Sequence, residues 1–235
     1  MSYIGLDIGG TKIRAILYDD KIVKNVLVET DKDNFFKQIN EIVKELFDDK
    51  VEGIGIGVPG SVKDGIVHRI THLSLDKVDF KKELNVDVPV YVANDANCFV
   101  LGEYHFGSKK KNIVGLVLGT GVGAGILIGG KVYSGSDGYA GEFGGIPFKD
   151  KTFDYYCSGR GFNEEDYGEN LACLLQHIVI SLNPEVIVLG GSVSKSYDKF
   201  EEKMKKKLKE LVPFDVKVEV AHLDVNVLGA VSLCF

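Results

Sequence analysis

Cysteine is scarce in this chain, and its four occurrences lack the short spacings of zinc or redox motifs. Cys98, Cys157, Cys173 and Cys234 are spread over 235 residues. We therefore expect free thiols in a reducing compartment. The net charge of −6 argues against a nucleic-acid-binding surface, so no nucleic-acid partner is expected.

Long apolar runs are absent as well. No stretch approaches the ~18 apolar residues of a membrane span, and no charged and apolar leader precedes Tyr3. We expect a cytoplasmic protein without a membrane partner. The three arginines, Arg14, Arg69 and Arg160, indicate compositional bias and carry no information about chemistry. The histidines form no cluster in the sequence; they are His68, His72, His105, His177 and His222.

Glycine, by contrast, is abundant, and its distribution reveals a repeat. The segment IGLDIGGTKIRAILYDDKIV aligns without a gap, 110 positions later, with VGLVLGTGVGAGILIGGKVY. Each copy is typical of a strand, a glycine turn, a strand, a short turn and a strand. Chance similarity between two apolar hairpins is the alternative, but the gapless turn favours an internal duplication.

The rest of the chain alternates between helix and strand patterns. Helices are expected at 31–48 after a Thr30–Asp31 cap, and at 96–106, 164–182, 195–211 and 225–235. Strands are expected at 51–59, 88–95, 185–191 and 216–223. This order predicts two α/β lobes with mixed sheets around one cleft. We assign residues 1–107 to the N-terminal lobe, to which a helix at 224–235 returns, and 108–223 to the C-terminal lobe.

A turn without side chains lets backbone N–H groups approach an anion, and phosphate is the usual one. Gly9–Thr11 follows the first strand, and Gly119–Gly121 follows its repeat. Two such turns could hold one polyphosphate from both sides, although GTGVGAG alone also suits a tight hairpin. A carboxylate beside phosphate repels it unless a cation intervenes, so Asp7 indicates Mg²⁺, bound through water. Val117 replaces Asp7 in the second copy, so that turn is expected to hold phosphates alone.

Three further segments are candidate sites. Gly190–Gly191 ends a strand and could lie against a base or ribose, although turns between strands and helices often carry such glycines. Asn94 and Asp95 stand where a strand becomes a helix, so either could simply cap the helix. In the functional interpretation Asp95 accepts the proton of an attacking hydroxyl group and Asn94 binds a neighbouring one. Further candidates for binding a polyol are Gly60, Glu142 and Glu164.

Six motifs occur in the order DIGGTK, GIGVPG, NDANC, LGTGVGAG, GYAGEFGG and VLGG. Together they resemble the ROK family of sugar kinases, within the actin-like ATPase superfamily. The resemblance implies an α/β fold of two actin-like (ribonuclease H-like) lobes, with mixed sheets related by internal duplication and a cleft between them. It also implies ATP and Mg²⁺ as cofactors, a small-molecule sugar as substrate, and a homodimer.

The same resemblance implies roles for individual residues. The phosphate and Mg²⁺ site would consist of Asp7, Gly9, Gly10, Thr11, Lys12, Gly119, Thr120 and Gly121. Gly190 and Gly191 match the adenosine-side turn, and Asp95 matches the catalytic base. The sugar contacts would come from Gly60, Asn94, Asp95, Glu142 and Glu164.

The chain departs from this family where relatives bind zinc. GEFGG replaces the usual GExGH, so Gly145 stands in place of a histidine. In YYCSGRGFNEE, Cys157 matches the second cysteine of the family's CxCGxxGCxE, Phe162 the third, and Glu164 the final glutamate. One thiolate without a histidine cannot form a tetrahedral site, so we predict no structural zinc.

The sequence therefore predicts ATP-dependent phosphorylation of a primary hydroxyl group, O6, of a hexose or amino-hexose, with Asp95 as the general base. One alternative is a non-catalytic regulator that binds nucleotide or sugar and keeps the ATP site but has lost its sugar pocket. Another is a kinase that uses polyphosphate or a different nucleotide as its phosphoryl donor.

Overall fold

The computed structural model describes residues 1–68, 70, 73, 75–221 and 225–235. Arg69, His72, His222 and the end of the strand expected at 216–223 lie outside the described residues. The chain divides into two compact units. The first comprises Met1–Gly107, Gly135–Tyr139 and Asp224–Phe235, and the second comprises Ser108–Ser134 and Ala140–Leu223.

The segment Gly135–Tyr139 belongs to the first unit, whereas the predicted division placed it in the second. Gly138 has a φ of +78°, and a Cβ atom there would lie 2.9 Å from the carbonyl oxygen of Val62. Lys63 and Asp137 add an ion pair with an Nζ–Oδ1 distance of 2.6 Å. These contacts join positions far apart in the chain and have no local sequence signature.

The first unit is built on a five-stranded sheet with the strand order β3-β2-β1-β4-β7. Its strands are β1 (Ser2–Ile8), β2 (Lys12–Asp19), β3 (Lys21–Glu29), β4 (Val51–Val58) and β7 (Val90–Asn94). β1 runs antiparallel to β2 and parallel to β4, so the sheet is mixed, as expected. A small hairpin of β5 (Ser61–Lys63) and β6 (Ile66–His68) follows β4.

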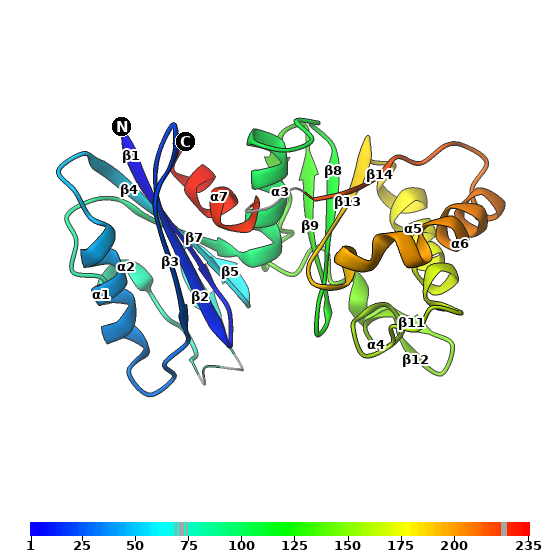
Figure 1. Ribbon diagram of the computed structural model, residues 1–235, viewed down its shortest axis with the longest axis horizontal. Helices are drawn as coiled ribbons and strands as arrows, with labels where there is room; N and C mark the ends of the chain where they lie inside the picture. Colours follow the sequence, from blue (N-terminus) through cyan, green and yellow to red (C-terminus); the bar gives the residue numbers. More distant parts are fainter. Residues whose placement is uncertain (69, 71–72, 74, 222–224) are drawn as a thin grey trace. The chain divides into compact units, whose positions relative to one another are not determined.

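Helices cover both faces of this sheet (Figure 1). They are α1 (Phe35–Leu46) and α2 (Phe80–Glu83) on one face, and α3 (Asp95–His105) and α7 (Val225–Val231) on the other. Ile4 and Leu6 of β1 pack in one core with α1, while Gly5 between them faces α7. This alternation follows from the period of two along a strand.

Glycines let α7 contact its neighbours backbone to backbone. A Cβ atom at Gly55 of β4 would lie 1.8 Å from the Ala230 carbonyl oxygen, and one at Gly229 would lie 1.7 Å from that of Cys98 in α3. No side chain fits at such distances. The C-terminal segment is therefore an integral part of the first unit.

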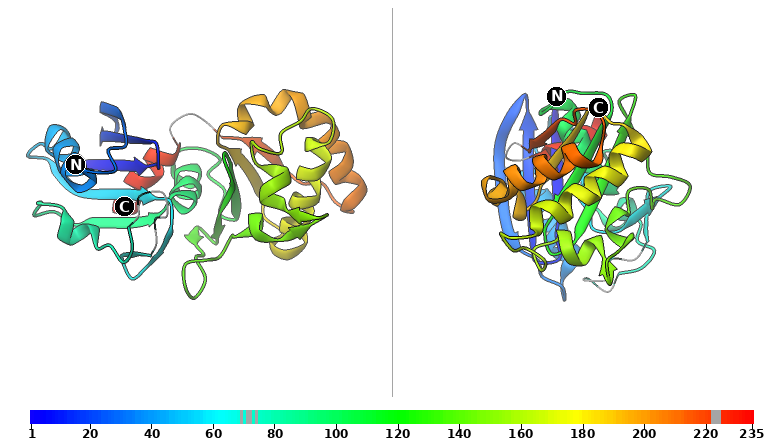
Figure 2. Two further views of the ribbon diagram at one scale, coloured as in Figure 1. Left: turned by 90° about the horizontal axis from the view of Figure 1, so that it is seen from below. Right: turned by 90° about the vertical axis from the view of Figure 1, so that its right-hand side faces the viewer.

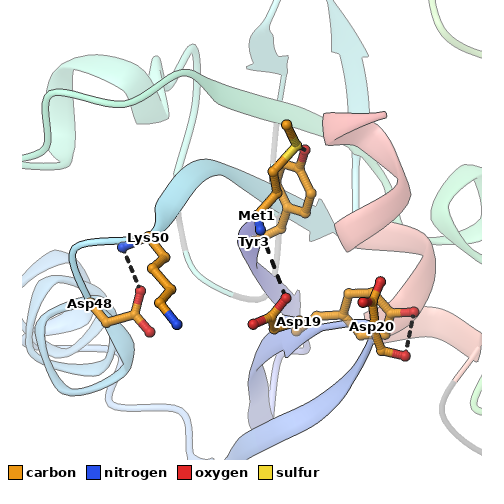
Figure 3. Close-up of polar contacts among 7 residues, drawn as sticks. Met1, Tyr3, Asp19, Asp20, Asp48 and Lys50 are labelled. Carbon is orange, nitrogen blue, oxygen red and sulfur yellow. Dashed lines mark hydrogen bonds and ion pairs between the residues drawn. The ribbon is translucent and has the colours of Figure 1, made fainter.

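The start of β1 lies near the turn between β2 and β3 and near the segment that joins α1 to β4 (Figure 3). The amino group of Met1 pairs with Asp19 at 3.8 Å, and the Asp48 carboxylate accepts the backbone N–H of Lys50 at 2.9 Å. The rings of Tyr3 and Phe235 are 5.5 Å apart, which brings the two termini together. The termini thus lie at the opposite end of β1 from Asp7.

The second unit repeats the first sheet strand for strand, with the order β10-β9-β8-β13-β14. Its strands are β8 (Ile113–Leu118), β9 (Val122–Ile128), β10 (Lys131–Val132), β13 (Val186–Gly190) and β14 (Val218–Val220). The equal order confirms the predicted duplication. The hairpin pairing differs in one respect: Ile8 pairs with Ile13, but Leu118 pairs with Val122. The second turn is therefore one residue shorter, although the sequences align without a gap.

Helices α5 (Tyr167–Leu182) and α6 (Tyr197–Leu211) lie side by side on the sheet of the second unit (Figure 2). Together with α4 (Phe153–Cys157) they form its core against Leu116 and Leu118 of β8. A short hairpin, β11 (Pro147–Phe148) and β12 (Lys151–Thr152), precedes α4. Among the described residues, no helix has the length and apolar character needed to cross a bilayer.

Two predicted helices begin later than their patterns indicate. α1 starts at Phe35 and not at residue 31, because the Asp31 carboxylate accepts the N–H groups of Asp33 and Asn34 in a turn before the helix. α5 starts at Tyr167 and not at residue 164, because Asn163 accepts the N–H of Asp166 at 2.7 Å. Both side chains form turns of their own where a helix start was expected.

Candidate functional site

Asp7 lies near the carboxyl end of β1, on the edge where the parallel strands β1, β4 and β7 end together. It pairs with Gly57 of β4, which in turn pairs with Ala93 of β7. Asp95, the first residue of α3, follows directly on this edge. Burial, reinforced by the charge of Asp95, raises the pKa of Asp7 to about 7, and Arg14 partly opposes the shift.

This arrangement fits a divalent cation. The charge of Asp95 disfavours the ionisation of Asp7, and a doubly charged ion between them would stabilise the Asp7 carboxylate. In the described part of the chain, no group of three or more His, Cys, Asp and Glu side chains is placed to hold a metal. Asp7 would therefore bind Mg²⁺ together with substrate phosphate oxygens and water, which is the usual mode for this ion.

Asn94 caps α3. Its Oδ1 atom accepts the backbone N–H groups of Ala96 at 3.0 Å and Asn97 at 3.3 Å. Its Nδ2 atom donates to the Gly60 carbonyl oxygen at 3.1 Å, so two predicted sugar contacts are neighbours. Asp95 also accepts the Ala96 N–H, at 2.9 Å through Oδ1. The sequence allowed either residue to cap the helix. In the structure Asn94 is the N-cap, and Asp95 is the first residue of the helix.

The turn of the first unit is held by a hydrogen bond of its own and by two from Thr30, which lies outside the repeat. The Gly9 N–H donates to the Lys12 carbonyl oxygen at 2.8 Å, and a Cβ atom at Gly9 would lie 2.9 Å from that oxygen. The Thr30 hydroxyl donates to the Gly9 carbonyl at 2.8 Å, and its N–H donates to that of Thr11 at 2.9 Å. The prediction of Thr30 as part of a helix cap was wrong; it fixes the glycine turn. Thr11 and Lys12 are exposed, whereas Gly10 is half-buried.

The turn of the second unit is held in a similar way by α4 and the residues after it. The Gly119 N–H donates to the Gly121 carbonyl oxygen at 2.9 Å. Asp154 of α4 accepts the N–H of Val122, directly after the turn, at 2.8 Å. The Gly159 N–H donates to the Gly119 carbonyl oxygen at 2.7 Å. Thr120, in the middle of the turn, is exposed.

The third glycine turn lies against the second. Gly190 ends β13 and pairs with Val117 of β8. Gly191 has a φ of +84°, and a Cβ atom there would lie 2.4 Å from the Leu118 carbonyl oxygen. Only glycine fits both conditions. Two segments that the sequence assigned to phosphate and to adenosine are therefore neighbours within the second unit.

The two predicted sugar-binding glutamates of the second unit have different surroundings. Glu142 is exposed and precedes a 3-10 turn, Phe143–Gly145, where its carbonyl oxygen accepts the Gly145 N–H at 3.1 Å. The Glu164 side chain is 66% exposed and pairs with Lys199 of α6 at 2.8 Å, and this hydrogen bond lowers its pKa. The Asp154 side chain packs beside the 3-10 turn, since a Cβ atom at Gly144 would lie 3.5 Å from the Asp154 Cβ.

We predict that the purified protein carries no stoichiometric zinc. A Cβ atom at Gly145 would meet no atom within 4 Å, but glycine itself supplies no zinc ligand. Cys157 is buried, and burial raises the pKa of its thiol, which disfavours the thiolate that zinc requires. Elemental analysis of the protein, purified without chelators, checks this; stoichiometric zinc would overturn it.

Comparison with known proteins identifies relatives along the full chain. The model of the ROK family matches residues 3–165 and 162–233. An N-acetyl-D-glucosamine kinase from Mannheimia succiniciproducens is 32% identical, with 92% of each chain covered. A glucokinase from Thermotoga maritima is 26% identical and covers 99% of this chain and 97% of its own.

A solved structure extends the likeness to three dimensions. It is a ROK family glucokinase from Streptomyces griseus in complex with glucose and AMPPNP, with a TM-score of 0.84, 26% identity and 99% of both chains covered. The duplicated units, the glycine turns and these relatives define a sugar kinase with the actin-like ATPase fold. The chain belongs to the ROK family.

Proposed function

We propose that the protein transfers the γ-phosphoryl group of ATP to the 6-hydroxyl group of a hexose or amino-hexose. The observation that carries the proposal is the pair of carboxyl groups, Asp7 and Asp95, on one edge of the first sheet. Asp7 is suited to binding a metal ion, and Asp95 is suited to accepting a proton. Phosphoryl transfer needs both, since its catalysis consists mainly of positioning and charge stabilisation.

In this proposal Asp95 accepts the proton of the sugar hydroxyl group as its oxygen attacks the γ-phosphorus atom. Asn94 and Gly60 bind neighbouring hydroxyl groups, and their mutual hydrogen bond fixes them relative to the start of α3. Asp7 holds Mg²⁺, which neutralises phosphate charge when bound. Lys12 adds a positive charge at the turn that follows β1.

The second unit contributes the backbone turn Gly119–Gly121 to phosphate binding and Gly190–Gly191 to the nucleoside. The support is the contact between the two turns at Leu118 and Gly191. Glu142, placed at the 3-10 turn, is proposed to bind the sugar. Glu164 is proposed as a further sugar ligand, which requires that it leave its ion pair with Lys199.

N-acetylglucosamine is the sugar that we favour. Relatives named for that substrate are 26% to 32% identical to this chain over the aligned residues, and the Thermotoga glucokinase is 26% identical. The substituent of the sugar ring is proposed to lie near Gly145, where a Cβ atom would meet no atom within 4 Å.

A coupled assay for ADP release tests the proposal. Mg²⁺-ATP is offered with glucose, fructose, mannose, allose, N-acetylglucosamine and N-acetylmannosamine, and polyphosphate replaces ATP in a parallel series that detects sugar phosphate. We expect one amino sugar or hexose to support turnover with ATP. Turnover with polyphosphate alone would contradict the proposed donor, and ATP binding without turnover for any sugar would favour a regulator.

A further inference from the structure

Arg160 lies beside the glycine turn of the second unit. It follows Gly159, whose N–H donates to the Gly119 carbonyl oxygen at 2.7 Å. Its Nη2 atom is 2.7 Å from Oδ2 of Asp154. The other oxygen of Asp154 accepts the Val122 N–H at 2.8 Å. One carboxylate therefore binds the strand that leaves the turn and also the guanidinium group.

The guanidinium group is accessible. The Arg160 side chain is 65% exposed and that of Asp154 is 34% exposed. An ion pair this exposed contributes little to folding stability. It does orient the planar guanidinium, whose five N–H donors suit the oxygens of a phosphate group.

The second turn lacks a charge that the first one has. In the repeat, Lys12 of the first turn aligns with Val122, and Gly119–Gly121 contains no charged residue. Arg160 is the only arginine in the sequence of the second unit, Ser108–Ser134 and Ala140–Leu223. A polyphosphate that approaches a chain of net charge −6 gains from a fixed cation at each of its contacts.

We propose that Arg160 binds a phosphate group of the nucleotide at the turn Gly119–Gly121, and that Asp154 positions its guanidinium group. The proposal rests on the proposed function, because it requires that this turn binds nucleotide. Arg160 thereby restores, from a different segment, the positive charge that the second copy of the hairpin lost at Val122.

Calorimetry with Mg²⁺-ADP and Mg²⁺-ATP, combined with steady-state kinetics, tests this role. For Arg160→Gln we expect both nucleotides to bind about tenfold more weakly, as for the loss of one charge-assisted hydrogen bond. The salt dependence of the affinity should become shallower, because one charge contact is lost. The KM for the sugar and the melting temperature should not change.

Three further variants separate binding from positioning. Arg160→Lys keeps the positive charge but lacks the planar set of N–H donors. It should bind nucleotide more tightly than Arg160→Gln and more weakly than the wild type. Asp154→Asn should weaken nucleotide binding less than Arg160→Gln while keeping the steeper salt dependence of the wild type. Lys207→Gln removes a partly exposed cation of the same unit, paired with Glu210 at 3.1 Å, and should leave nucleotide affinity unchanged.

An active wild-type enzyme whose nucleotide affinity is the same in Arg160→Gln would overturn this inference alone. So would a variant in which the KM for the sugar and the melting temperature change together with the affinity, because that pattern indicates a structural role for the loop. A wild-type protein that binds no nucleotide and phosphorylates no sugar would overturn the proposed function and this inference together.

Discussion

Replacement of Asp95 by asparagine is expected to lower kcat by about 10²–10⁴-fold, the usual contribution of a general base, while nucleotide binding persists. The amide has the shape of the carboxylate, and its oxygen can still accept the N–H of Ala96, as Oδ1 of Asp95 does at 2.9 Å. It cannot accept the proton of the attacking hydroxyl group. Steady-state kinetics with Mg²⁺-ATP, with calorimetry of nucleotide binding on the same protein, measures both effects.

A matched control is Glu41→Gln, a neutralised carboxylate of the same unit. Glu41 lies on the exposed side of α1, 4.0 Å from Lys37. Its replacement by glutamine should leave kcat unchanged. Asp95→Asn also removes one of the two causes that raise the pKa of Asp7, so that pKa should fall in the variant. Turnover close to that of the wild type in Asp95→Asn would remove Asp95 from the role of base.

Replacement of Asp7 by asparagine is expected to abolish Mg²⁺-dependent turnover and, without metal, to stabilise the fold. Its pKa is about 7 in the folded protein and 3.8 as the ordinary value. The folded state therefore holds a proton that the unfolded chain has released, and stability, greatest below pH ~4, falls as the pH rises through 7. At ~1.4 kcal/mol per unit, the loss is about 4 kcal/mol above pH 7.

Denaturant unfolding of the metal-free wild type and Asp7→Asn, at pH 5 and at pH 8, measures this effect. The stability of the wild type should drop relative to the variant by roughly 3 kcal/mol between these pH values, because asparagine does not titrate. Contributions from titrating groups that do not interact with Asp7 cancel in the comparison. An equal pH dependence of the two proteins, or Mg²⁺-ATP turnover retained in Asp7→Asn, would contradict the assignment of Asp7.

The repeat and the strand pattern were sufficient to predict most of the fold and the place of Asp7. A carboxylate near the end of an apolar strand, followed by glycines, has a local signature, and its second copy at Gly119 supports the interpretation. The duplication also predicted the equal strand order of the two sheets. Helix starts were less accurate, because Asp31 and Asn163 form turns whose geometry depends on neighbouring backbone N–H groups.

The contacts that complete the site could not be predicted in this way. The hydrogen-bonded residues Asp154 and Val122 are 32 positions apart in the sequence, and Thr30 and Gly9 are 21 positions apart. Neither pair has a spacing that local patterns report. Arg160 was set aside as a feature of composition, yet it is bonded to the carboxylate that holds the second turn. The match of Glu164 to a sugar contact relied on alignment alone, and its carboxylate pairs with Lys199.

The most direct test of the central claim is a ³¹P NMR analysis of the products formed from Mg²⁺-ATP and N-acetylglucosamine, with glucose in a parallel reaction. We expect a sugar 6-phosphate and ADP to appear in equal amounts with the wild type, and neither with Asp95→Asn. Formation of ADP and inorganic phosphate without a sugar phosphate, or phosphorylation of a hydroxyl group other than O6, would contradict it.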